Sequence, residues 1–88
     1  MHSYYLARSK QGHDAGEVYM VMGEENGRLI CVNGRNKTLD KPKRKNPAHM
    51  QPIFKGEWRS VLSETPDDCC IKRCIRIYLK SEDPKEEA

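Results

Sequence analysis

The sequence contains no long apolar segment and few large aromatic residues. None of its 88 residues belongs to a run approaching the ~18 consecutive apolar residues that a membrane-spanning helix requires. Hydrophobic residues make up 36% of the chain. A chain of this length buries only roughly 60–65% of the surface that its unfolded form exposes, so its core is thin. These shortages exclude a membrane span and the deep cofactor crevices of most metabolic enzymes. They favour one domain: a small barrel, a small helical bundle, or a module that acts on a larger partner.

An export signal and a disulfide framework are also missing. The first eight residues lack the apolar run of a signal peptide. Of the four cysteines, Cys31 lies inside an apolar run, while Cys69, Cys70 and Cys74 fall within six residues of one another. We therefore expect free thiols and a cytoplasmic protein, since the cytoplasm is reducing.

Motifs for catalysis and for metal binding are weak or missing. The chain has no glycine-rich phosphate loop of the form G-x-x-x-x-G-K. His13 and Asp14 are adjacent, but no nucleophile accompanies them, and Asp14 is expected as a turn former whose side chain accepts backbone hydrogen bonds. Cys70 and Cys74 form a C-x₃-C pair without the regularly spaced second pair of a zinc site, so we expect buried thiols. The prediction is a protein that is not an enzyme, with no cofactor and no metal.

Charge is distributed unevenly along the chain. The net charge is only +3, from 16 Lys and Arg against 13 Asp and Glu. A basic block over residues 35–45 contains six cations and one acid, whereas the tail over residues 81–88 is acidic. The six cations are Arg35, Lys37, Lys41, Lys43, Arg44 and Lys45. Such a block indicates binding to a polyanion. The simpler interpretation is a solvated loop that keeps the protein soluble.

Three short apolar runs predict β-strands in the first half of the chain. They cover residues 4–7, 18–22 and 29–32, and each contains β-branched or aromatic residues. Asn26 and Gly27, between the second and third runs, are a strong hairpin signal, and Asn33 and Gly34 mark another turn. Strands at this spacing favour an antiparallel meander that can close as a barrel.

The middle of the chain is expected at the margin of this sheet. Residues 38–47 contain two prolines and are too basic for a core, so they are expected as an extended loop or an edge segment. Residues 49–54 are expected to return to the sheet, where Pro52 restricts them to an edge.

The last third of the chain predicts a helix. Thr65 suits a helix cap and Pro66 the first helical position. Apolar residues then recur at helical spacing: Ile71, Cys74, Ile75, Tyr78 and Leu79. We expect a helix over about residues 66–79, within an amphipathic segment over residues 58–80 that packs on the barrel formed by residues 1–57.

The segment over residues 5–21 resembles a KOW motif. It has a strand, a glycine-containing loop and a second strand with alternating apolar residues, and Gly16 falls at the characteristic glycine. Residues 26–34 and 45–50 are similar to the later segments of one KOW branch, which contains archaeal and eukaryotic large-subunit ribosomal proteins and small bacterial KOW proteins. The resemblance covers residues 4–53. It implies an SH3-like β-barrel of the KOW type and RNA binding, with ribosomal RNA and proteins of the ribosome or of translation as partners.

The residues in the glycine loop and the basic block agree with this implication. Gly12 and Gly16 can take positive φ, so the loop can turn tightly beside a phosphate backbone. Cations supply the salt-dependent part of RNA binding, and arginine adds bidentate phosphate contacts. The expected RNA-binding residues are Arg8, Lys10, Gly12, His13, Gly16, Arg35, Lys37, Lys41, Lys43, Arg44 and Lys45. Tyr4 or Tyr5 either stacks on a base or packs within the protein.

The alternative function belongs to a different class. SH3-like barrels also bind proteins, and this module would then dock in a transcription or translation complex through Trp58 and the helix. Trp58 either seals the seam between barrel and helix or is an exposed anchor, and the sequence leaves both open. RNA binding should weaken steeply with salt, whereas apolar docking should depend on salt only weakly.

Overall fold

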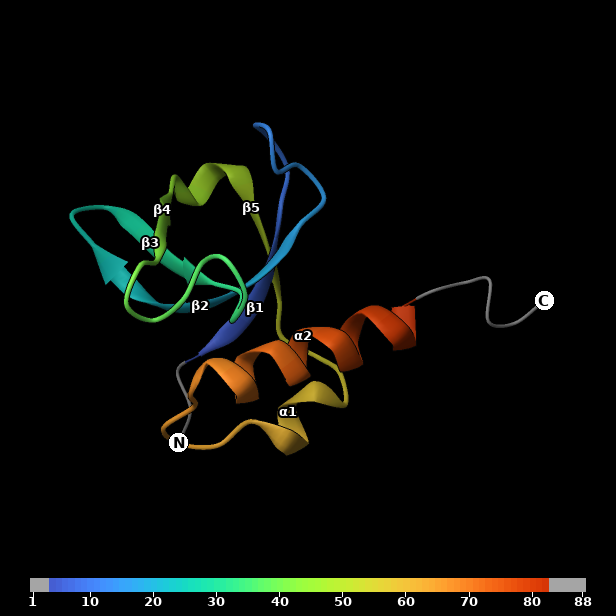
Figure 1. Ribbon diagram of the computed structural model, residues 1–88. Coiled ribbons are helices and arrows are strands. Elements are labelled where there is room, and N and C mark those ends of the chain that lie inside the picture. The colour runs from blue at the N-terminus through green and yellow to red at the C-terminus, as the bar shows by residue number, and fades with distance from the viewer. Residues whose placement is uncertain (1–3, 83–88) are drawn as a thin grey trace.

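Five antiparallel strands form one sheet, and two helices pack against one of its faces (Figure 1). The computed structural model describes residues 4–82. The strands are β1 (Tyr5–Ser9), β2 (Val18–Glu25), β3 (Arg28–Val32), β4 (Lys43–Lys45) and β5 (Met50–Ile53), in the sheet order β4-β3-β2-β1-β5. The helical elements are a 3₁₀ turn (Pro47–His49), α1 (Trp58–Val61) and α2 (Asp68–Glu82). Of the acidic tail expected over residues 81–88, residues 83–88 lie outside the described range.

The first three strands confirm the predicted antiparallel meander. β1 pairs with β2, and β2 pairs with β3. The β2–β3 hairpin turns at Asn26 and Gly27, which both have positive φ (53° and 79°). This pair of left-handed residues is what the favoured two-residue hairpin turn requires, so the Asn-Gly signal located the turn correctly.

The two edge strands come from the segments that were expected at the margin. β4 pairs with β3 at one edge, and β5 pairs with β1 at the other. On β5, Pro52 lies opposite Ala7 of β1, and an edge strand tolerates a proline because one of its sides needs no backbone donor. The basic residues 43–45 therefore belong to a strand, and they are tied to the sheet.

A short link between the two edges makes the sheet curl. β4 and β5 lie at opposite edges, yet only residues 46–49 separate them. A flat five-stranded sheet would hold its edges about 19 Å apart, at about 4.8 Å per strand spacing. Five residue steps reach at most about 17 Å when fully extended, and a 3₁₀ turn rises only about 2 Å per residue. The strands therefore curve until the edges approach each other.

Both faces of the curled sheet are buried. On one face Leu6 and Met20 pack with Trp58, Ile71 and other helix residues. On the concave face a second cluster contains Ala7, Tyr19, Val21, Leu29, Cys31 and Met50. Neighbouring residues of one strand point to opposite faces, which explains why the strand runs are apolar throughout and do not alternate with polar residues.

The C-terminal segment over residues 58–80 differs from the expected single helix. It contains α1 and α2, which are separated by residues 62–67. The cap of α2 is Asp67, whose Oδ1 accepts a 2.8 Å hydrogen bond from the Cys70 N–H, so the prediction of Thr65 as the cap was wrong. Leu79 is 43% exposed and does not join the buried face.

Trp58 lies in the seam between the sheet and α2. Its side chain is fully buried, and its indole N–H donates a 2.9 Å hydrogen bond to the Lys55 carbonyl. The Cys74 thiol lies 3.5 Å from the Trp58 carbonyl oxygen, which it can reach as a donor. The indole therefore seals the core, which decides between the two roles that the sequence left open for Trp58.

The four cysteines are free thiols in different surroundings. Burial raises the pKa of Cys31 to about 11 and that of Cys74 to about 12, so both thiols are neutral at physiological pH. Cys69 is exposed, and Cys70 is half-buried. In residues 4–82 no helix is long and apolar enough to cross a membrane.

Candidate nucleic-acid interface

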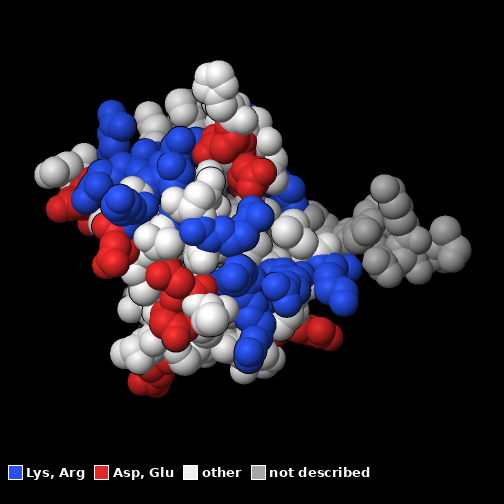
Figure 2. Space-filling model, in the orientation of Figure 1, with Lys and Arg blue, Asp and Glu red and all other residues white. Residues whose placement is uncertain are grey.

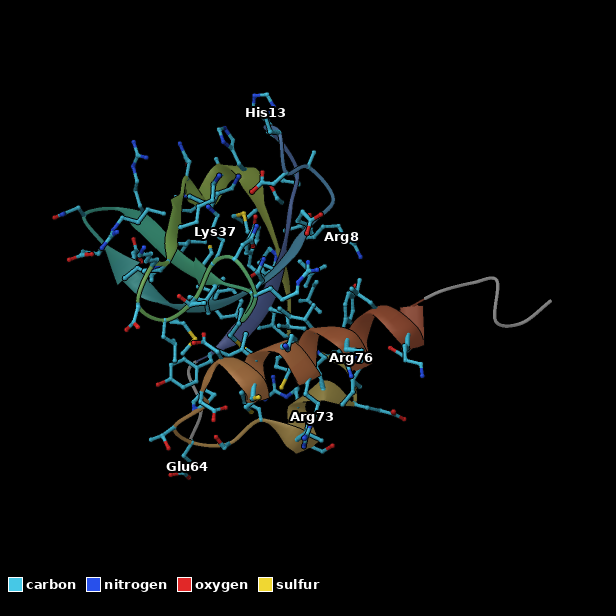
Figure 3. The ribbon with its side chains drawn as sticks, in the orientation of Figure 1. Arg8, His13, Lys37, Glu64, Arg73 and Arg76 are labelled. Carbon is cyan, nitrogen blue, oxygen red and sulfur yellow. The ribbon has the colours of Figure 1, made fainter. Side chains whose placement is uncertain are left out.

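The glycine loop between β1 and β2 turns at two left-handed glycines. Gly12 and Gly16 both have φ of +94°, as the sequence predicted for a tight turn. The Gly16 N–H donates a 2.8 Å hydrogen bond to the Ser9 carbonyl, and its own carbonyl accepts one from Arg8 Nη1 at 3.0 Å. These contacts fix the conformation of the loop and place His13 at its tip, where its side chain points away from the sheet (Figure 3).

The start of the basic block is shaped by a buried asparagine. Asn33 Oδ1 accepts hydrogen bonds from the backbone N–H groups of Arg35 (2.9 Å) and Lys37 (3.0 Å). Its Nδ2 donates to Asn36 Oδ1 at 3.0 Å. Asparagine favours such turns because its side chain replaces a backbone acceptor. The turn signal was read from the sequence, but the role of Asn33 and Asn36 in shaping a site was missed.

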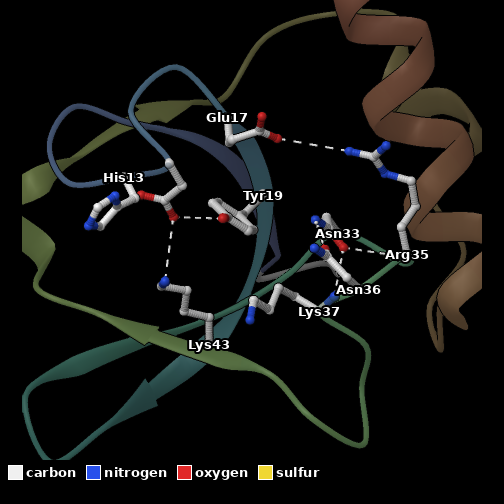
Figure 4. A pocket seen from close by; sticks show the side chains of 9 residues that line it. His13, Glu17, Tyr19, Asn33, Arg35, Asn36, Lys37 and Lys43 are labelled. Atoms are coloured by element: carbon white, nitrogen blue, oxygen red, sulfur yellow. Dashed lines mark hydrogen bonds and ion pairs between the residues drawn. The ribbon is translucent and has the colours of Figure 1, made fainter.

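The glycine loop, this turn and β4 meet at one pocket of about 270 Å³ (Figure 4). Three elements distant in sequence thus contribute to a single concave surface. The residues that line it are His13, Asp14, Glu17, Tyr19, Asn33, Arg35, Asn36, Lys37 and Lys43. Four of these, His13, Arg35, Lys37 and Lys43, were expected to contact RNA. The lining therefore combines three permanent cations with two carboxylates.

Asp14 is the centre of a hydrogen-bonded network on the inner side of this pocket. Its carboxylate accepts hydrogen bonds from Tyr19 Oη (2.6 Å), Ser9 Oγ (3.1 Å) and Lys45 Nζ (2.8 Å). The expectation that the Asp14 side chain would accept backbone hydrogen bonds is therefore corrected, because its partners are side chains. The network ties the glycine loop to β2 and β4.

Burial and hydrogen bonding act on the charge of Asp14 in opposite directions. Burial raises the pKa of its carboxyl, but the hydrogen bonds from Lys45, Tyr19 and Ser9 outweigh burial and hold that pKa well below the ordinary 3.8. Burial, and then the bond to Asp14, raises the pKa of Tyr19 above its ordinary 10.0. At neutral pH the network therefore consists of an anionic Asp14 and a neutral Tyr19.

Two cations of the basic block form short ion pairs with carboxylates. The Lys45 side chain is only 10% exposed and pairs with Asp14, because strand alternation turns Lys45 inward and Arg44 outward. Arg44 reaches Glu25 Oε1 with Nε (3.2 Å) and Nη2 (2.8 Å). Lys45 therefore does not belong to an exposed contact surface, and Arg44 must exchange a carboxylate for any phosphate.

The remaining expected residues lie outside the pocket. Arg8 stacks 5.9 Å from the centre of the Tyr78 ring on α2, away from Lys37 (Figure 3). The side chains of Lys10 and Lys41 are exposed but do not line the pocket. Tyr5 packs against Phe54 with ring centres 5.1 Å apart, which favours the packing role for that tyrosine.

Lysines and arginines gather in more than one place on the face that carries the basic block. Figure 2 shows one gathering over β3 and β4 and another over α2. The α2 cations are Lys72, Arg73, Arg76 and Lys80. They were seen in the sequence as the polar side of an amphipathic helix, but they were not assigned to a site.

Comparisons with known proteins assign this chain to no family: no family model matches it, and neither does any of the curated proteins compared with it. Within residues 4–82, no group of three or more His, Cys, Asp or Glu side chains lies in position to hold a metal ion. The features that bear on function are therefore the pocket and the charged surface around it.

Proposed function

We propose that this protein binds RNA without catalysing a reaction, and that it contacts phosphates through the pocket between the glycine loop and the basic block. One observation supports this above the others. Two separate segments of the sequence contain residues that were expected to bind RNA, and residues from both segments line the same pocket. They are His13 from the glycine loop and Arg35, Lys37 and Lys43 from the basic block. The KOW resemblance joins the same two segments in one RNA-binding module.

We further propose that the curled sheet is an SH3-like barrel of the KOW type. The strand order supports this, since β5 returns beside β1 and the β4–β5 link is a single 3₁₀ turn. The apolar cluster on the concave face, with Cys31 and Met50 from strands on either side, also supports a barrel interior.

The electrostatics of the pocket are compatible with an incoming phosphate. The Arg35–Glu17 and Lys43–Asp14 pairs are both 3.9 Å apart, which is long for a salt bridge. The Arg35–Glu17 pair is exposed, and exposed pairs contribute only about 0–1 kcal/mol. Lys43 shares Asp14 with the shorter contact from Lys45, so a phosphate can compete for Arg35 and for Lys43. Lys37 lines the pocket and makes no side-chain ion pair with a carboxylate of residues 4–81.

The setting of this activity is part of the proposal. The resemblance favours ribosomal RNA, and partners among proteins of the ribosome or of translation. A cytoplasmic location is supported by the four free thiols, which suit a reducing compartment.

Fluorescence anisotropy with labelled structured RNA tests this proposal. Arg35→Gln/Lys37→Gln removes two pocket cations, and Arg28→Gln/Lys55→Gln removes two exposed cations elsewhere, so the two variants have the same net charge. We expect the pocket variant to raise Kd about tenfold or more at low salt. The slope of log Kd against log salt concentration should fall by up to about two, because two fewer phosphates are neutralised. The control variant should stay within about twofold of the natural protein, because distant exposed charges are screened. Equal losses in both variants would overturn the pocket assignment.

The alternative, a protein-docking module, has lost its expected anchor because Trp58 is buried. The exposed apolar surface nearest to such a role is Phe54, which is 56% exposed and packs against Tyr5. Binding that depends on Phe54 and changes little with salt would favour docking over RNA binding.

A further inference from the structure

We infer that helix α2 is a second phosphate-contacting surface and that the RNA recognised is double-helical, with its backbone running from the pocket onto α2. This inference rests on the proposed RNA binding and adds to it the class of RNA and a surface outside the KOW resemblance. Four observations support it: the placement of the α2 cations, their lack of carboxylate partners, their continuity with the pocket, and the lack of a series of exposed aromatic rings in the pocket and on α2.

The cations of α2 lie on the side of the helix opposite its buried face. Ile71, Cys74 and Ile75 are buried against the sheet. At about 100° per residue, the basic positions fall within an arc of about 100° on the other side. Arg73 and Arg76 project from this side in Figure 3. From Lys72 to Lys80 the basic stripe is about 12 Å long, at about 1.5 Å per residue.

These cations lack the carboxylate partners that occupy the basic block. Residues 69–81 contain four cations and no acid. Among the side chains of residues 4–81, no carboxylate forms an ion pair with any of the four α2 cations, whereas Arg35, Lys43, Arg44 and Lys45 each have one. The α2 stripe is therefore the part of the described basic surface whose charge is least compensated.

The turn that carries Arg35 joins the pocket to α2. Gly34 has φ of +79°, and a Cβ at this position would collide with the Asp68 carbonyl oxygen and approach Lys72. The Leu39 N–H donates a 3.0 Å hydrogen bond to Asp68 Oδ1, so the chain beyond the turn is also fastened to the start of α2. Arg35 extends beside α2 in Figure 4, and the two gatherings of cations lie on one face in Figure 2.

The composition of this surface favours a duplex over a single strand. Single strands are held largely by stacking of bases on exposed aromatic rings. In the pocket and on α2 the tyrosines are Tyr19, which is buried and bonded to Asp14, and Tyr78, which is half-buried under Arg8. The exposed ring of the pocket is the His13 imidazole, which offers one stacking surface and not the series of rings on which successive bases of a single strand stack. Double-stranded RNA is recognised by shape and by contacts to phosphates and 2′-hydroxyls, which cations and polar groups supply.

The test compares a labelled RNA duplex of about 20 base pairs with its single strand at two salt concentrations. Arg73→Gln/Arg76→Gln is measured beside the charge-matched Arg28→Gln/Lys55→Gln, and circular dichroism confirms that each variant folds. We expect the duplex to bind more tightly than the strand. The α2 variant should raise Kd for the duplex about tenfold and lower the salt slope by about two, while the control stays within about twofold. If the α2 variant does not fold, Lys72→Gln/Lys80→Gln removes the two ends of the same stripe.

The outcomes separate this inference from the proposed function. RNA binding that depends on Arg35 and Lys37 but not on Arg73 and Arg76 overturns the inference and leaves the proposed function in place. Tighter binding to the single strand than to the duplex overturns the inference that the RNA is double-helical. Failure to bind either RNA overturns both proposals. Polyglutamate is the probe for an acidic protein partner. If it binds as tightly as the duplex, and if the α2 variant loses this binding, the stripe contacts an acidic protein and the inference is overturned.

Discussion

The basic block and the basic stripe of α2 differ in what their cations contact. Four of the block's cations lie beside acids of the sheet and its loops. Arg44 pairs with Glu25 and Lys45 with Asp14 at 2.8 Å, whereas the Arg35–Glu17 and Lys43–Asp14 pairs are 3.9 Å apart. The α2 stripe has no such neighbours among the side chains of residues 4–81. Antiparallel pairing brings distant acids beside β4, whereas a helix presents the residues closest in its own sequence. A count of charges along the chain therefore overstates the free charge of the block and understates that of α2.

The largest expected effect comes from breaking the best-buried contact of the block. Asp14→Ala removes the shared acceptor of Lys45, Tyr19 and Ser9, and it leaves the Lys45 ammonium buried without a counterion. Breaking a buried pair from one side costs about 3 kcal/mol or more. For a chain of this size, 3 kcal/mol corresponds to a Tm lower by roughly 12–24 °C, measured by thermal unfolding.

A double-mutant cycle with Lys45→Met is the control for Asp14→Ala. Lys45→Met fills the same space with an apolar side chain, so Asp14→Ala/Lys45→Met should be more stable than Asp14→Ala alone. If the two substitutions simply add, Lys45 and Asp14 are not coupled, and the charge of Lys45 is not compensated by Asp14.

Acid pH should weaken the same contact. The pKa of Asp14 is depressed in the folded protein, so its contribution to stability is complete above the unfolded pKa near 3.8 and is lost as pH falls toward the folded pKa. Chemical unfolding in a pH series should show stability falling below about pH 4, and Asp14→Asn should remove part of that fall. Equal pH dependence in both proteins would contradict the network.

Much of the fold could be predicted from local patterns. Apolar runs bounded by turn residues located β1, β2 and β3, and Asn26-Gly27 located the hairpin, because these signals depend on neighbouring residues alone. The cap of α2 was misplaced because both Thr65 and Asp67 are residue types that cap helices well, and the propensity of each does not decide which of them caps α2.

The candidate site was predicted only in part, since its residues are brought together by strand pairing. The sequence marked His13 and Lys43 as separate features, but nothing local indicated that they line one pocket. Lys45 was misassigned because a lysine in a basic run is ordinarily exposed, and only the alternation of β4 turns it toward Asp14. The Asn33 turn was visible in the sequence, whereas its position over α2 was not.

Releasing the block's cations from their acids should make the block resemble α2. Glu17→Gln/Glu25→Gln removes the partners of Arg35 and Arg44 without touching a cation. We expect tighter RNA binding, by a few-fold to about tenfold at low salt, because the freed cations can each neutralise a phosphate. Anisotropy measures the gain, and Glu57→Gln/Glu64→Gln, two exposed acids outside the pocket, is the charge-matched control. An equal gain in the control would show an effect of net charge alone.

The smallest expected effect is on stability, when cations are removed from α2. Arg73 and Arg76 have no carboxylate partner among the side chains of residues 4–81, and they lie in the middle of the helix, away from the ends where its dipole acts. Glutamine has nearly the same helix propensity as arginine, so Arg73→Gln/Arg76→Gln should change the free energy of unfolding by less than about 0.5 kcal/mol. The same variant is expected to lose RNA affinity, which separates a binding role from a structural one. A loss of stability above about 1 kcal/mol would mean that these side chains are held in the folded protein, and the contrast with the block would then disappear.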